Sequence, residues 1–268
     1  MTGSTTDAKP LDRLLTQNSE LRRNGIWNWT LPAFVVKLSD GTRFNTCPHA
    51  GSCARVCYAR FGTYRFSNVR DRHMRNLEYL LGDGDNWEAQ MTREVAHTRF
   101  NPSGKPHTLP FDECDPFVAR WAATGGKAIR IHDAGDFFSA EYLARWVRIA
   151  RSRPHVLFYA YTKEISLLLD TELPDNFRII FSYGGTEDHL INRDTHRHAD
   201  VFPTEQELDA NGYFNQEDND ILAAIAPTTR IGIVMNNIPA TFKKFAGKPM
   251  SRMLDRNTDN ENPPELHL

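Results

Sequence analysis

The sequence lacks a long apolar run and a strong excess of charge of either sign. No stretch approaches the roughly 18 apolar residues of a membrane-spanning helix, and the first residues form neither a basic nor an apolar segment. Lysine plus arginine count 32 against 34 for aspartate plus glutamate, a net charge of -2. Global electrostatics therefore do not draw the chain to nucleic acid or to an anionic membrane. We expect a cytoplasmic protein that does not bind membranes.

Cysteine is scarce and unevenly placed. Only four occur in 268 residues; Cys47, Cys53 and Cys57 fall close together, and Cys114 lies far away. For a chain that is not secreted, such clustering favours metal ligation or redox chemistry over disulfide bonds.

The remaining sequence is typical of a folded globular protein, with 40% hydrophobic and 25% charged residues. Amphipathic helical patterns alternate with strand-like runs: Trp87, Met91 and Val95 share one helix face, and Ser139 is suited to cap a second helix. The strand-like runs lie at 34–38, 127–132, 156–161, 177–182 and 230–235. This alternation predicts parallel βαβ units.

We therefore predict an α/β fold, either a partial (β/α) barrel of about six mainly parallel strands or an open sheet. Polar extensions are expected at both ends: a flexible segment over 1–24, a single α/β domain over 25–246 with a Cys-rich loop at 45–60, and a polar tail over 247–268. In either architecture the functional groups gather at the carboxyl ends of the strands.

The Cys-rich loop carries the strongest chemical signal. Five residues separate Cys47 from Cys53, and three separate Cys53 from Cys57. The intervening proline, glycine and serine supply turns that can bring three thiolates to one centre. Three ligands leave a fourth metal position open, as a catalytic centre needs. The alternatives are three unrelated buried thiols, or a closed zinc site completed by His49, His73 or Cys114.

The loop and its surroundings resemble two groups of proteins. The segments 25–33, 46–48, 57–59 and 62–64 are similar to those of the phage gene product 88 family. The cysteines, together with the segment 130–138, also resemble radical S-adenosylmethionine iron-sulfur proteins. The standard motif of those enzymes has three and then two intervening residues, whereas this loop has five and three. The resemblance to the gene product 88 family implies a phage protein of the host cytoplasm.

The second resemblance implies a cofactor and its ligands. Cys47, Cys53 and Cys57 would hold a 4Fe-4S cluster whose remaining iron chelates the amino and carboxylate groups of S-adenosylmethionine, with an electron donor as partner. Four residues would lie around S-adenosylmethionine: Tyr58, Asp133, Gly135 and Asp136. Asp136 is our choice for the ammonium contact, with Gly135 allowing close backbone approach. The alternative for Asp136 is a cap of the following helix, and for Tyr58 a packing role.

Other strand ends offer catalytic candidates, namely His132, Lys163 and Tyr183, and the pair Asn236–Asn237 follows the last strand. Their alternative is a purely structural role. His189, His196 and His198 match no spacing with a defined mechanism, and we expect them to be polar surface residues.

Six arginines between Arg55 and Arg75 accompany a single acid, Asp71, and several aromatic residues. This pattern predicts a surface that binds a nucleotide or nucleic acid through phosphate contacts and stacking. The alternative is a solvated helix face whose arginines pair with the acidic stretch at 205–220.

These observations lead to two hypotheses of function. The first is an iron-sulfur, radical S-adenosylmethionine-like phage enzyme that modifies a nucleotide or nucleic acid. The second is a zinc-stabilised nucleic-acid-binding or interaction protein without catalytic activity.

Overall fold

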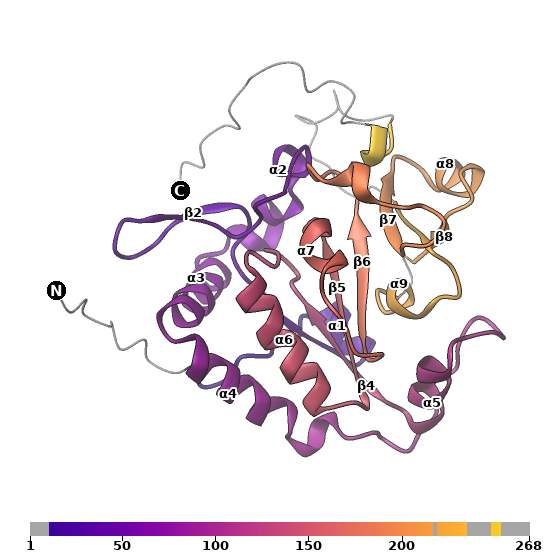
Figure 1. Ribbon diagram of the computed structural model, residues 1–268, viewed down its shortest axis with the longest axis horizontal. Helices are drawn as coiled ribbons and strands as arrows, with labels where there is room; N and C mark the ends of the chain where they lie inside the picture. The colour runs from indigo at the N-terminus through magenta and orange to yellow at the C-terminus, as the bar shows by residue number, and fades with distance from the viewer. Residues whose placement is uncertain (1–10, 217–218, 235–247, 253–268) are drawn as a thin grey trace.

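A seven-stranded parallel sheet forms the centre of the protein (Figure 1), for which a computed structural model describes residues 11–216, 219–234 and 248–252. In spatial order the strands are β1 (Ile26–Trp29), β4 (Lys127–Ile131), β5 (Val156–Thr162), β6 (Phe177–Ser182), β7 (His198–Phe202), β9 (Arg230–Val234) and β8 (Phe214–Asn215). All neighbouring strands pair in parallel. The six longer strands follow chain order and the sheet stays open, as in the predicted partial (β/α) barrel.

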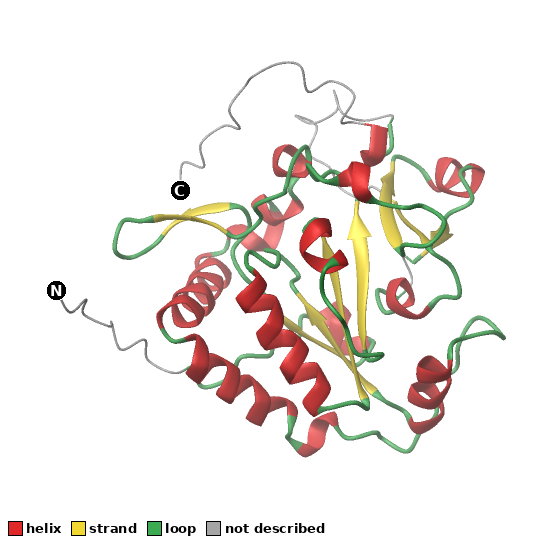
Figure 2. Ribbon diagram, viewed as in Figure 1, coloured by secondary structure: helices red, strands yellow, loops and turns green. Residues whose placement is uncertain are grey.

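The α/β prediction is therefore confirmed, although individual strands differ. The run predicted at 34–38 forms β2 (Val35–Lys37), which pairs antiparallel with β3 (Arg43–Asn45) in a separate hairpin (Figure 2). The predictions at 127–132, 156–161, 177–182 and 230–235 correspond to β4, β5, β6 and β9.

Helices cover both faces of the sheet. One face packs against α3 (Ser67–Gly82), α4 (Gly84–Val95), α6 (Ala140–Ser152) and α7 (Ile165–Leu169). The other packs against α1 (Ser19–Arg23), α5 (Pro116–Thr124) and α9 (Leu222–Ile225). The remaining helices are α2 (Cys53–Val56) and α8 (Glu205–Ala210), with 3-10 turns at Tyr58–Arg60, Gly62–Arg65, Thr98–Phe100, Asp188–Leu190 and Met250–Arg252.

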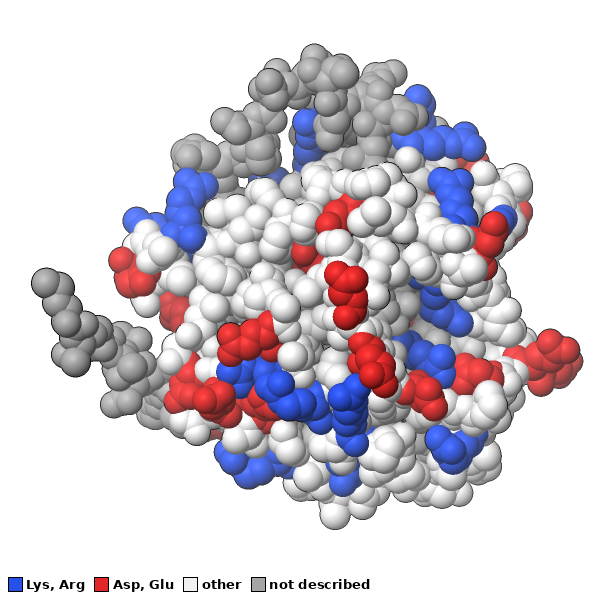
Figure 3. All heavy atoms as spheres, viewed as in Figure 1, with Lys and Arg blue, Asp and Glu red and all other residues white. Residues whose placement is uncertain are grey.

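The two helices expected from periodicity are confirmed. Trp87, Met91 and Val95 of α4 are fully buried, and the Ser139 side chain accepts a hydrogen bond from the Tyr142 N–H at the start of α6. Arg145 of α6 joins the two helices through Glu88 of α4, with 2.9 Å between Nη1 and Oε2. Figure 3 shows the resulting mixture of acidic and basic side chains over these helices.

Residues 11–24 differ from the predicted flexible segment. Leu14 and Leu15 are buried, and their backbone N–H groups donate to the Glu94 carboxylate at 2.7 and 3.2 Å. The polar composition of the segment predicted that the entropy cost of ordering it would be too large. Burial of the two leucines offsets that cost.

Gly135 sits where the loop after β4 meets the chain after β1. Its φ is +86°, and a Cβ atom at this position would lie 2.7 Å from the Leu31 Cβ. The Leu31 N–H donates to the Ala134 carbonyl at 3.1 Å, which holds the two segments together. Only glycine combines this backbone conformation with this close approach.

We expect Gly135→Ala to destabilise the protein more than Gly212→Ala does. Gly212 has a similar φ of +70°, but no atom lies within 4 Å of the place that a Cβ would take, so it reports backbone strain alone. Strain costs about 1 kcal/mol, and the clash at Gly135 adds about 1–3 kcal/mol. Urea unfolding of both variants measures the difference, and equal losses would contradict the close packing at Gly135.

Candidate functional site at the carboxyl ends of the strands

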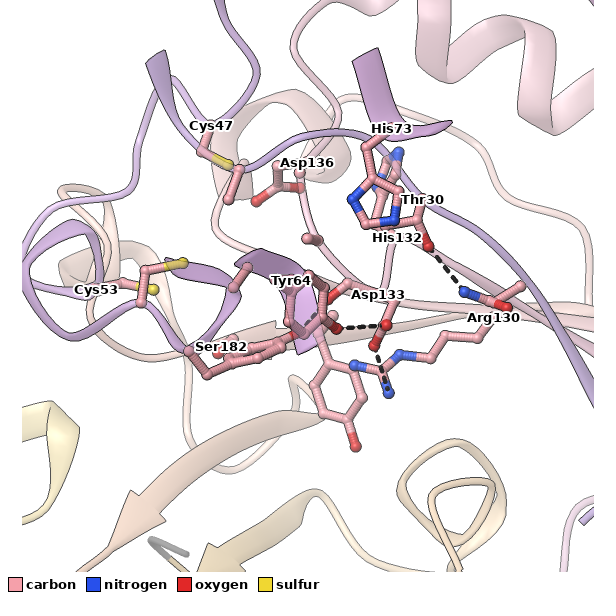
Figure 4. A pocket seen from close by; sticks show the side chains of 18 of the residues that line it. Thr30, Cys47, Cys53, Tyr64, His73, Arg130, His132, Asp133, Asp136 and Ser182 are labelled. Atoms are coloured by element: carbon pink, nitrogen blue, oxygen red, sulfur yellow. Dashed lines mark hydrogen bonds and ion pairs between the residues drawn. The ribbon is translucent and has the colours of Figure 1, made fainter. Parts of the chain in front are cut away.

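A pocket of about 990 Å³ lies at the carboxyl ends of the strands (Figure 4). Its lining includes residues that follow or end four neighbouring strands: Thr30 after β1, His132, Asp133 and Asp136 after β4, Lys163 after β5, and Ser182 and Tyr183 at β6. All three cysteines of the Cys-rich loop line the same pocket, as does Tyr58. The strand-end residues and the cysteines named from the sequence therefore share one cavity.

The Cys-rich loop is docked onto the loop between β6 and β7. The Cys53 N–H donates to the Gly184 carbonyl at 2.9 Å, and the Thr186 N–H donates to the His49 carbonyl at 3.0 Å. Gly51 has a φ of +43°, and a Cβ there would lie 2.7 Å from the Gly184 oxygen. Glycine at position 51 thus permits the contact that places the cysteines at the pocket.

The cysteines lie at one end of the pocket, and Figure 4 shows Cys47 and Cys53 apart from His73, His132 and Arg130. Burial, with Cys53 nearby, raises the pKa of Cys57 to about 11, and burial also raises the pKa of Cys47. Within the described ranges, no three Cys, His, Asp or Glu side chains are grouped closely enough to hold one metal ion.

Lys163 places a cation beside this end of the pocket. Its Nζ donates to the Ser182 Oγ at 2.9 Å, and no carboxylate of the described residues pairs with it within 4.0 Å. Burial alone would lower the pKa of Lys163, but the negative charge of the neighbouring Cys53 and Asp136 outweighs that effect. The pKa is raised overall, so the amine stays protonated. A partly buried ammonium with no carboxylate within 4.0 Å among the described residues favours an anionic group in the pocket.

Asp136 ties the ends of β4 and β5 together. Its Oδ1 accepts from the Thr162 hydroxyl at 2.6 Å and the Phe137 N–H at 2.8 Å, and its Oδ2 accepts from the Lys163 N–H at 2.9 Å. The carboxylate does not cap α6, since Ser139 has that role. Oδ2 retains capacity for another donor from the pocket.

Asp133 belongs to a polar network that the sequence did not predict. It accepts from the Tyr64 hydroxyl at 2.5 Å, and its Oδ1 lies 3.6 Å from Arg130 Nη1. The same guanidinium atom lies 3.2 Å from Asp220 Oδ1. Tyr58, which is 56% exposed, donates its hydroxyl to the Asp133 carbonyl. Arg130 lies in β4, at a position of the predicted strand that faces the pocket. A charged residue inside an apolar strand was the only feature of the sequence that could have indicated this network.

The other candidates are placed as follows. His132 is buried after β4 and lines the pocket. Tyr183 is also buried, and its hydroxyl accepts from Arg193 Nε at 2.9 Å. The pair at 236–237 lies outside the described residues. His198 contradicts the expected surface position: it is fully buried in β7, with its Nε2 3.2 Å from the Tyr213 hydroxyl.

The arginine run has exposed and structural members. Arg65, Arg70 and Arg75 are exposed, whereas Arg72 donates to the Asn76 side chain at 3.1 Å and to the backbone of Arg13. Among the described residues, no ion pair joins this run to the acidic stretch at 205–220. The alternative interpretation, in which the run pairs with this stretch, is therefore not found in the described part of the stretch, which omits 217–218.

His49, within the Cys-rich loop, packs against two carboxylates. The backbone N–H of His49 donates to Glu164 Oε1 at 3.1 Å. Its ring Nε2 lies 3.6 Å from Glu164 Oε2 and 3.7 Å from Glu187 Oε1. Burial, with Asp136 nearby, raises the pKa of Glu164 to about 8. The carboxyl group is thus mainly protonated in the folded protein at neutral pH.

Fold and site together define an α/β protein with a parallel sheet and a cysteine-lined pocket at the strand ends. The chain belongs to the gene product 88 family, whose model matches residues 7–244. It is 33% identical over 175 residues to the Gene 88 protein of Mycobacterium phage L5, covering 64% of this chain and 65% of that protein. The Gene 88 protein of Mycobacterium phage D29 is 31% identical over the same length and coverage.

The matched region spans about two thirds of the length of these relatives. No solved structure matches the chain. The comparisons confirm the resemblance to the phage family. In the part of the chain that the structure describes, no helix is both long and apolar enough to cross a bilayer.

We expect Glu164→Gln to flatten the pH dependence of stability. The wild-type carboxyl has its ordinary pKa near 4.5 when unfolded and about 8 when folded, so its neutral form stabilises the fold at low pH. That contribution, up to about 5 kcal/mol before solvent screening reduces it, is lost as pH rises from 4.5 through 8. Glutamine stays neutral throughout.

Urea unfolding between pH 5 and 9 measures this difference. The exposed Glu113→Gln is the matched control and should follow the wild type. Parallel curves for Glu164→Gln and the wild type would rule out a protonated Glu164.

Proposed function

We propose that the protein is an iron-sulfur, S-adenosylmethionine-dependent phage enzyme, with Cys47, Cys53 and Cys57 as the cluster ligands. The observation that carries the proposal is the position of these cysteines: all three line one pocket at the carboxyl ends of parallel strands. Functional groups of parallel α/β folds gather at this edge.

The number of cysteines supports a cluster over a closed zinc site. A closed zinc site takes four ligands, whereas three thiolates can hold three irons of a 4Fe-4S cluster and leave one iron open. The three cysteines that line the pocket match that number.

The neighbouring side chains support the same assignment. The Lys163 ammonium, near Cys53, would offset the negative charge of the thiolates that metal binding requires. The remaining acceptor capacity of Asp136 Oδ2 is available to an ammonium group. When bound, the cluster would supply an open iron for S-adenosylmethionine and, from an electron donor, the electron that breaks its sulfonium bond.

We predict that alanine at Cys47, Cys53 or Cys57 removes most of the bound iron, because each thiolate would hold one iron. Cys114→Ala is the matched control. Cys114 packs against the hydrophobic core on the sheet face covered by α1, α5 and α9, and it does not line the pocket. Iron and zinc analysis of anaerobically purified protein, with visible absorbance, measures the effect. Zinc in a colourless wild-type protein, or full iron retention by Cys53→Ala, would reject the cluster.

A nucleotide or nucleic acid is the proposed substrate. Arg65, in the 3-10 turn before α3, and Arg70, in the first turns of α3, are both exposed, as is Phe66 between them. Helix α3 also lines the pocket through Val69 and His73. Exposed cations beside an exposed aromatic ring, on a segment that continues into the pocket lining, suit a phosphate backbone and a stacked base.

We expect the Arg65→Ala, Arg70→Ala double variant to bind single-stranded DNA or RNA with a weaker salt dependence. Each phosphate contact contributes roughly 0.7–0.9 to the slope of log affinity against log salt, so the slope should flatten by about 1.5. The double variant Arg93→Ala, Arg120→Ala removes the same charge from exposed positions on α4 and α5 and should keep the wild-type slope. Equal slopes for all three proteins, or no strand binding at low salt, would exclude this interface.

A further inference from the structure

Trp29, Tyr142 and His132 form a buried chain of hydrogen bonds that ends at the pocket. Trp29 Nε1 donates to the Tyr142 hydroxyl at 2.9 Å, and the same hydroxyl lies 2.8 Å from His132 Nε2. An indole is only a donor, so the Tyr142 oxygen accepts from Trp29. That oxygen has a second lone pair, so pairing decides the His132 tautomer: the Tyr142 proton finds an acceptor at His132 Nε2 only if the His132 proton is on Nδ1. This assigns the proton of the neutral His132 ring to Nδ1.

His132 is held neutral, strained and incompletely paired. Burial, together with the nearby Arg130, lowers the pKa of His132 to about 3. The residue is 3% exposed, and its Nδ1 has no hydrogen-bond partner among the described residues. Its backbone has a φ of +65°, a conformation unusual for a residue other than glycine. Buried unpaired donors and strained backbones both cost stability and are characteristic of functional sites.

Arg130 and His73, which line the pocket with His132, present no unpaired positive charge to a ligand. The Arg130 guanidinium lies 3.6 Å from Asp133 and 3.2 Å from Asp220, so its charge is already neutralised. His73, which also lines the pocket, has a pKa lowered to about 4 by burial, despite the opposing effect of Asp133. A phosphate or carboxylate therefore finds no unpaired cation at Arg130 or His73, whereas Arg72, which also lines the pocket, has only neutral hydrogen-bond partners among the described residues.

Aromatic rings flank the same part of the pocket. The Tyr64 and His73 ring centres are 5.9 Å apart, and Tyr64 is 5.6 Å from Tyr58. Thr30 adds a small polar side chain to the lining (Figure 4). Neutral hydrogen-bonding groups beside aromatic faces suit a flat, uncharged heterocycle.

We propose that this end of the pocket binds a nucleobase, and that His132 Nδ1–H donates a hydrogen bond to a ring nitrogen or carbonyl oxygen of the base. The proposal does not depend on the cluster. The base belongs either to S-adenosylmethionine or to a nucleotide substrate, and the chemistry of recognition is the same for both. In the second case, the exposed arginines of α3 would hold the phosphates outside the pocket while the base enters it.

The test compares His132→Phe with the wild type by calorimetry of the full chain, using S-adenosylmethionine, adenosine, guanosine, cytidine and uridine as probes. Phenylalanine keeps a ring of similar size but removes the donor, so affinity should fall about 3- to 10-fold for the probes that bind. His189→Phe, at an exposed position outside the pocket, is the matched control and should bind as the wild type does. A loss confined to S-adenosylmethionine assigns the base to the cofactor, and a loss for nucleosides without the sulfonium assigns it to the substrate.

A second variant keeps the test decisive if His132→Phe fails to fold. Tyr142→Phe removes the hydroxyl that fixes the His132 tautomer but lies behind the imidazole, outside the pocket lining. It should weaken base binding, and nitrogen NMR should show the Nδ1–H tautomer in the wild type and a mixture in the variant. Absence of binding by the wild type, an Nε2–H tautomer, or unchanged affinity in the folded variants would overturn the proposal.

Iron content, measured on the same samples, separates this proposal from the cluster assignment. His132→Phe and Tyr142→Phe should retain the iron of the wild type, because neither replaces a proposed ligand. Normal iron with unchanged base affinity would reject the nucleobase site alone. Weakened base binding in a protein without iron would reject the cluster alone.

Discussion

The burial of the Asp136 carboxylate is the constraint on which the pocket depends. Three donors satisfy it, two of them from Thr162 and Lys163 at the end of β5. The Asp136 N–H in turn donates to the Thr46 carbonyl at 2.9 Å, next to the first cysteine. A buried carboxylate is costly unless hydrogen-bonded, so the loops after β4 and β5 are restricted to arrangements that supply these donors. The Cys-rich loop is held by the backbone N–H of the same residue.

This constraint also divides the pocket into two electrostatic environments. At the cysteine end, the Lys163 ammonium has a hydroxyl partner but no carboxylate partner among the described residues. At the other end, Arg130 is neutralised by two aspartates, and His132 carries one uncharged donor. The first environment suits thiolates or an anionic group, and the second suits a neutral heterocycle. A single ligand with a charged end and a flat uncharged end would match both.

Sequence reasoning was most successful where local pattern and topology act together. β6 was predicted at its observed bounds because its run is mostly apolar, as expected of a parallel strand covered on both faces. β1 and β7 were missed because Asn28, His198 and Asp200 interrupt their apolar pattern, although all three are buried. The rule that parallel strands end at one edge placed His132 and Lys163 at the pocket. It could not supply the pairing of Arg130 with Asp220, which are distant in sequence and meet only in the folded chain.

Contacts between residues distant in sequence also explain the unusual cysteine spacing. The five residues between Cys47 and Cys53 are not a flexible linker, because they make the contacts that dock the loop. The His49 carbonyl accepts from Thr186, and Gly51 approaches the Gly184 carbonyl too closely for any side chain. A shorter interval would remove one of these contacts with the loop after β6. The spacing thus follows from a contact more than a hundred residues away along the chain, and this contact determines which cavity the cysteines face.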